Sequence, residues 1–137
     1  ILKEDRMEYS EKIMSAGCAK AYARKLNFGT TVLTYVLWDL TSPKPQPIYV
    51  GTAKSQSRID NHARKANGGT SLTRKSGAIP LAEHVERQSK NHGPDWIGFS
   101  FHQHNSFDDA KVTERELIQG WGIKKLGGKL FNRQMSG

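Results

Sequence analysis

The chain has little of what disulfide-stabilised, metal-cluster or membrane proteins need. Its 137 residues contain a single cysteine, Cys18, so it has neither an internal disulfide nor a cluster of thiolate metal ligands. No apolar run approaches the roughly 20 residues of a membrane span, and none has the character of a secretory signal. We therefore expect no membrane partner and a cytoplasmic or otherwise intracellular compartment. A secreted or delivered toxin domain has the same composition.

Acidic residues are also scarce relative to basic ones. There are 13 Asp and Glu against 21 Lys and Arg, which gives a net charge of +8 and a pI near 9.7. Such an excess favours a polyanionic partner, because each neutralised phosphate releases counterions and so adds affinity. The length suits one compact domain. Because the first residue is Ile1 rather than Met, we expect a processed product, a trimmed chain or part of a longer protein.

Residue patterns predict a small sheet. Two β-forming runs, 31–38 and 48–51, flank a segment with prolines at 43, 45 and 47, which predicts a hairpin whose tip the prolines exclude from the ladder. Alternating apolar residues over 96–102 predict a third strand. The expected fold class is α/β, with a largely antiparallel three-stranded sheet flanked by helices.

Helical periodicity appears in four other places. Residues 1–26 read as helical with a break near Gly17, and further helices are expected from about Ser55 or Ser57 to 66, over 80–90 and over 109–120. We expect residues 1–28 to form an N-terminal helical extension to a compact domain over 29–137. A helix covering one sheet face is favoured for this extension over a DNA-reading helix.

The hairpin carries two tyrosines and leads into a cationic segment. With period-two alternation, Leu33, Tyr35 and Leu37 share one face of their strand, and Tyr49 shares a face with Gly51, so the two phenols can stand side by side. The segment 54–75 holds six cations against Asp60 alone. These are Lys54, Arg58, Arg64, Lys65, Arg74 and Lys75, of which Arg58 and Lys65 share one helical stripe with His62.

Glu114 lies on the apolar side of its predicted helix. It stands three, four and seven residues before Leu117, Ile118 and Trp121, whereas Glu116 is turned about 200° away from it. Glutamate is rarely buried unless it is paired or binds a metal ion. Glu114 is therefore expected either to pair with a surface lysine or to be a metal ligand.

Several ordered positions resemble the GIY-YIG nuclease domain, whose members include homing endonucleases, restriction enzymes and the bacterial excision-repair endonuclease. The likeness covers roughly residues 31–134, and the first signature triplet reads Leu33-Thr34-Tyr35, without the glycine of the family. The matching positions are Tyr35, the triplet Tyr49-Val50-Gly51, Arg58, His62, Glu114 and Asn132.

The resemblance implies a divalent-metal-dependent DNA endonuclease. One Mg²⁺ or Mn²⁺ ion on Glu114 and a phosphate-binding Arg58 would neutralise charge, and Tyr35 would be the general base. A nearby cation is expected to lower the pKa of Tyr35 from about 10. Tyr49 would orient the water or the other phenol.

The remaining implied site residues are His62, in register with Arg58, and Asn132, which would donate hydrogen bonds or brace the site. Lys54, Arg64, Lys65, Arg74 and Lys75 are the expected nucleic-acid-binding residues. The expected partner is double-stranded DNA, with no small-molecule cofactor. Because a domain this small often needs a second copy or another module to reach both strands, we expect a homodimer or covalent attachment to another module.

Other functions fit the same residues. A non-catalytic DNA-binding module of this fold shares the cationic segment, and a nuclease acting on RNA or branched nucleic acid shares the implied chemistry. His102 and His104 could form half of a zinc site, but no cysteine or further histidine cluster completes four ligands. His84 and His92 are expected at the surface.

Overall fold

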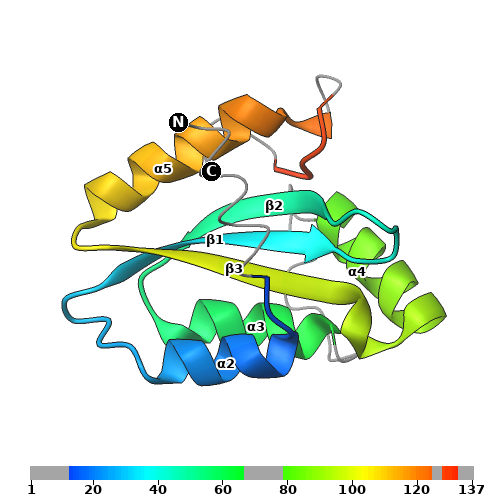
Figure 1. Cartoon of the computed structure of the whole chain (residues 1–137), viewed down its shortest axis with the longest axis horizontal. Helices are drawn as coiled ribbons and strands as arrows, with labels where there is room; N and C mark the ends of the chain where they lie inside the picture. Colours follow the sequence, from blue (N-terminus) through cyan, green and yellow to red (C-terminus); the bar gives the residue numbers. More distant parts are fainter. Residues whose placement is uncertain (1–12, 67–78, 125–127, 133–137) are drawn as a thin grey trace.

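The computed structural model describes residues 13–66, 79–124 and 128–132, and it is an α/β fold with a three-stranded antiparallel sheet (Figure 1). This architecture confirms the predicted α/β class. The elements in chain order are α2 (Ala16–Arg24), β1 (Val32–Asp39), β2 (Gln46–Ala53), α3 (Gln56–Ala66), α4 (Ile79–His92), the 3₁₀ helix η1 (Pro94–Trp96), β3 (Ile97–His104) and α5 (Phe107–Trp121).

The sheet has the order β2-β1-β3, so β1 is its centre and β2 is an edge strand. Tyr35 stands opposite Gly51 in the β1–β2 pair, and Leu37 stands opposite Tyr49. The prediction that the prolines exclude their segment from the ladder is wrong at Pro47, which pairs with Trp38 inside β2. Proline is tolerated there because an edge strand has one unpaired side and the register shifts just before Trp38.

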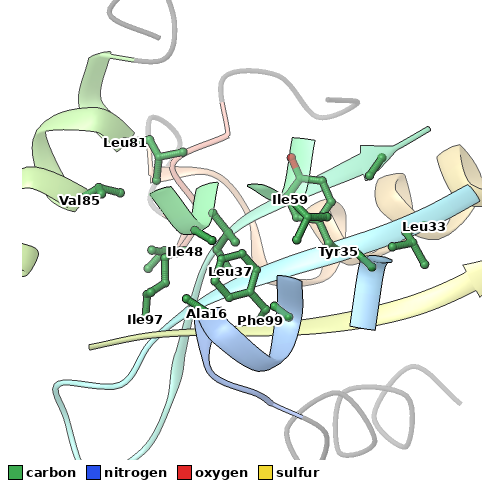
Figure 2. Close-up of a cluster of buried hydrophobic side chains, with 14 of the residues drawn as sticks. Ala16, Leu33, Tyr35, Leu37, Ile48, Ile59, Leu81, Val85, Ile97 and Phe99 are labelled. Atoms are coloured by element: carbon green, nitrogen blue, oxygen red, sulfur yellow. The ribbon is translucent and has the colours of Figure 1, made fainter. Parts of the chain in front are cut away.

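Alternation along β1 divides the interior between the two faces of the sheet. Helices α2 and α3 cover one face and α5 covers the other (Figure 1). Leu33, Tyr35 and Leu37 pack in the cluster that contains Ile59 of α3 and the buried alanines of α2 (Figure 2). The intervening Val36 and Trp38 pack with Val50 against the α5 residues Leu117 and Ile118.

The start of the described chain belongs to this same body. Met14 exchanges two backbone hydrogen bonds of 2.8 Å with Phe99 of β3, and Ala19 of α2 is buried in the core. The predicted helix is wrong at residues 13–15, which are not helical, and α2 begins at Ala16, one residue before Gly17. The first part of the predicted extension, residues 1–12, lies outside the described residues. In the described parts of the chain, every helix is too short or too polar to cross a membrane.

Candidate active site

A pocket of about 400 Å³ opens where the edge strand β2 passes between the helical layers. Its lining comes from β2, the turn after it, the first turn of α3 and one side of α5. The lining residues are Tyr49, Gly51, Thr52, Lys54, Ser55, Ser57, Arg58, Phe107, Lys111 and Glu114.

The position at the sheet edge explains how groups from opposite layers share one pocket. Successive residues of a strand point to opposite faces. Tyr49 packs against the cluster that holds Tyr35, whereas Thr52 donates from its Oγ1 to Glu114 Oε1 on α5 at 2.9 Å. A central strand would have a further strand on each side, whereas β2 has a strand on one side only, so the two layers can meet around its end.

Tyr35, His62 and Tyr49 form an aromatic group against the pocket. The Tyr35 hydroxyl lies 3.0 Å from His62 Nε2, and the Tyr49 ring centroid lies 6.2 Å from Tyr35 and 5.9 Å from His62. Tyr35 is fully buried, whereas Tyr49 lines the pocket. A Cβ at Gly51 would overlap the Cζ and Oη of Tyr35, so the glycine makes room for this phenol.

Burial controls the ionisation of both phenols. Desolvation raises the pKa of Tyr35 well above its usual value, and the neighbouring Tyr49 adds to the rise, while Arg58 lowers it through its charge and hydrogen bonding. Burial likewise raises the pKa of Tyr49, with Arg58 opposing and Glu114 reinforcing the shift. The expected lowering of the Tyr35 pKa is therefore wrong for this structure, because desolvation outweighs the nearby cation.

Glu114 is a buried carboxylate that faces the pocket. Its side chain is 1% exposed, and it accepts hydrogen bonds from Thr52 Oγ1 on Oε1 and from Lys111 Nζ on Oε2 at 3.1 Å. The expected pairing with a lysine is therefore confirmed, and Glu114 lies on the apolar side of α5 as the helical spacing predicted. Glu116, by contrast, is exposed.

Glu114 is the carboxylate among the lining residues and the one that could hold a hard divalent cation. Mg²⁺ keeps several waters and is bound by one or two carboxylates together with substrate phosphate. The ammonium of Lys111 already occupies a cation position on Glu114 Oε2, which marks where positive charge is stabilised. Within the described ranges no group of three or more His, Cys, Asp or Glu residues could form a larger site.

The two histidines considered as half of a zinc site lie elsewhere. The rings of His102 and His104 stack with centroids 4.7 Å apart on β3, the opposite edge strand from the pocket. They do not belong to the pocket lining. No third ligand accompanies them among the residues that the structure describes.

Asn132 braces the sheet edge and does not line the pocket. Its Oδ1 accepts from the Val50 N–H at 2.9 Å, and its Nδ2 donates to the Val50 carbonyl at 2.7 Å, so the amide replaces a neighbouring strand. Val50 separates Tyr49 from Gly51. The asparagine therefore holds the stretch of β2 that carries two pocket residues.

The expected nucleic-acid-binding residues divide into three groups. Lys54 lines the pocket. Arg64 is exposed further along α3 and donates a hydrogen bond to Asn61 Oδ1 at 2.8 Å. The backbone of Lys65 belongs to α3, but its side chain lies outside the described structure, as do Arg74 and Lys75 entirely.

Sequence reasoning missed several residues of the pocket and one partly buried pair. The missed lining residues are Thr52, Ser55, Ser57, Phe107 and Lys111. Phe107 and Lys111 stand seven and three residues before Glu114, on the stripe that already pointed to Glu114, so the same periodicity could have found them. No pattern in the sequence indicated that Thr52 would line the pocket. His84, expected at the surface, is half-buried with its Nε2 2.9 Å from Asp39 Oδ2.

Comparisons with protein-family models, with curated proteins and with solved structures found no match. The site geometry therefore carries the functional conclusion without support from relatives.

Proposed function

We propose that the protein is a divalent-metal-dependent DNA endonuclease of the GIY-YIG type, which hydrolyses phosphodiester bonds. The observation that supports this proposal is the meeting of Tyr49, Arg58 and Glu114 in one pocket, although β2, α3 and α5 contribute one each. Tyr35 and His62 adjoin Tyr49 in the same place. If these groups were far apart on the surface, they could not act on the same phosphate.

The negative charge of the phosphate would be neutralised by Arg58 and by a metal ion bound to Glu114. The Arg58 side chain is exposed at the pocket and can bind a nonbridging phosphate oxygen with its planar fork of donors. Glu114 would hold one Mg²⁺ or Mn²⁺ ion, which when bound supplies charge neutralisation and a Lewis acid. Lys111 must then release Oε2 of Glu114 for that ligand position to become available.

Tyr49 is the phenol that lines the pocket, so it is the better placed of the two to orient or deprotonate the attacking water. Tyr35, fully buried, is the supporting phenol, and its hydroxyl can donate to His62 Nε2 when that nitrogen carries no proton. Arg58 favours the ionised form of both phenols, whereas Glu114 opposes it. Neutralisation of the Glu114 charge therefore moves both pKa values toward the range in which a tyrosine acts as a base.

A non-catalytic DNA-binding module is the second candidate function. Lys54, Arg58 and Lys111 surround the pocket and would bind a phosphate backbone without any chemistry. We further propose that cutting both strands requires a second copy of the chain or an attached module, because one site holds one scissile phosphate at a time.

The test is plasmid nicking in the presence of Mg²⁺ or Mn²⁺, with Glu114→Gln as the diagnostic variant. The amide keeps the size of the side chain but binds a hard cation poorly, and we expect nicking to fall at least about 100-fold. Glu116→Gln is the matched control, since it removes an exposed acid from the same helix, and it should nick like the wild type.

Three outcomes separate the candidate functions. Loss of nicking in Glu114→Gln alone supports the endonuclease. Equal nicking by wild type and Glu114→Gln rejects the assignment. Salt-dependent DNA binding by a folded wild-type protein that never nicks DNA with either metal favours the binding module instead.

A further inference from the structure

An aromatic side chain at the pocket has no part in the proposed hydrolysis. Phe107 is the first residue of α5, lines the same pocket as Glu114 and is 37% exposed. It belongs to neither of the two buried clusters described above. A partly exposed aromatic ring beside a cationic pocket can contribute to binding a ligand that is both aromatic and anionic.

Two ammonium groups flank the Phe107 ring. Lys54 Nζ lies 3.9 Å from the ring centroid, and Lys111 Nζ lies 5.4 Å from it. The first distance is that of a cation–π contact, so Lys54 covers a face of the ring and must move from it to a phosphate before a base can stack there. An aromatic face bordered by lysines is the arrangement by which proteins bind single-stranded nucleic acid, since bases stack on the ring and phosphates meet the cations.

The geometry restricts the form of the nucleic acid. Bases within a duplex have both faces covered by their neighbours, so a ring can stack on a base only where that base has left the stack. The ring also shares its pocket with Glu114 and Arg58, which places any stacked base close to the phosphate that these residues would bind.

We propose that Phe107 is a stacking platform for an unpaired nucleotide beside the scissile phosphate, so that the preferred substrate is duplex DNA with an unpaired nucleotide. The position of the scissile phosphate rests on the proposed function. The stacking itself does not, because it requires binding alone.

The experiment measures binding without divalent ions, so that no cleavage occurs. Two short DNA duplexes share one sequence, and one of them carries an extra, unpaired 2-aminopurine whose fluorescence is quenched by stacking. We expect Phe107→Ala to weaken binding of the duplex with the unpaired base by roughly 5- to 150-fold and to abolish the quenching. Binding of the fully paired duplex should stay unchanged.

Two further variants make the test specific to the aromatic face. Phe107→Leu keeps an apolar side chain but removes the ring, and it should behave like Phe107→Ala. Val112→Ala is the matched control, because Val112 is an exposed apolar residue of the same helix that does not line the pocket, and it should bind like the wild type.

The stacking proposal is refuted if Phe107→Ala weakens both duplexes equally or weakens neither. It is also refuted if Phe107→Leu retains the preference for the unpaired base. Any of these results, combined with nicking that depends on Glu114, overturns the stacking while the endonuclease stands. Selective loss in Phe107→Ala, combined with a wild type that never nicks, leaves the stacking in place and rejects the endonuclease.

Discussion

Replacing Gly51 with alanine tests the contact on which the aromatic part of the site depends. The new Cβ would overlap the Cζ and Oη of Tyr35 and lie 2.8 Å from its Cε1. The Tyr35 ring is fully buried and its hydroxyl is 3.0 Å from His62, so it has little space to move away. Gly51→Ala is therefore expected to displace the ring or the strand.

The expected loss follows from two contributions. Overpacking a buried site costs about 1 to 3 kcal/mol, and loss of the hydrogen bond between Tyr35 and His62 adds about 0.5 to 1.5 kcal/mol. We expect the free energy of unfolding to fall by roughly 2 to 4 kcal/mol, which is a large part of the total for a domain of this size. Urea denaturation followed by tryptophan fluorescence measures the change.

Gly17→Ala is the control for the change from glycine to alanine. Gly17 lies in α2, and a Cβ there would meet nothing within 4 Å. The substitution should therefore stabilise the protein by roughly 0.5 to 1 kcal/mol, because alanine loses less backbone entropy in a helix.

A double variant identifies the cause of the loss. Tyr35→Leu removes the atoms that a Cβ at Gly51 would overlap, so Gly51→Ala should cost at least about 1 kcal/mol less in that background than in the wild type. If the two losses add to within about 0.5 kcal/mol, the overlap with Tyr35 is not the reason that position 51 is glycine.

Three other perturbations have expected results. Because burial raises the pKa of Tyr35 in the folded state, its contribution to stability is complete below the unfolded pKa of about 10 and is lost as pH rises above it. Tyr35→Phe should therefore flatten the alkaline fall in the free energy of unfolding, and an unchanged slope would contradict this. Asn132→Leu leaves the buried N–H and carbonyl of Val50 without their partner and should cost about 2 to 4 kcal/mol in urea denaturation; a loss under about 0.5 kcal/mol would show that the brace is dispensable. Lys111→Met frees Oε2 of Glu114 and should tighten Mn²⁺ binding on the order of tenfold by calorimetry, whereas Lys111→Arg should not. Unchanged or weaker binding in Lys111→Met would mean that the ammonium does not occupy a cation site.

Much of the fold was predictable because it depends on neighbours in the chain. Alternation along 31–38 and 96–102 identified β1 and β3, and the spacing of Glu114 from Leu117 placed that carboxylate on the inner side of α5. The strand limits near Pro47 were less predictable, since proline is excluded from a central strand but not from an edge strand, and the order of strands is not a local property.

Local sequence determined which side chains share a face, such as Leu33, Tyr35 and Leu37 on one strand and Phe107, Lys111 and Glu114 along one helix. Only the tertiary structure decided that Tyr35 is fully buried, that its pKa rises where a nearby cation predicted a fall, and that Asn132 closes the edge of β2 at Val50, 82 residues away. The reason is that periodicity is a property of adjacent residues, whereas desolvation and hydrogen-bond partners depend on which distant segments supply the surrounding atoms.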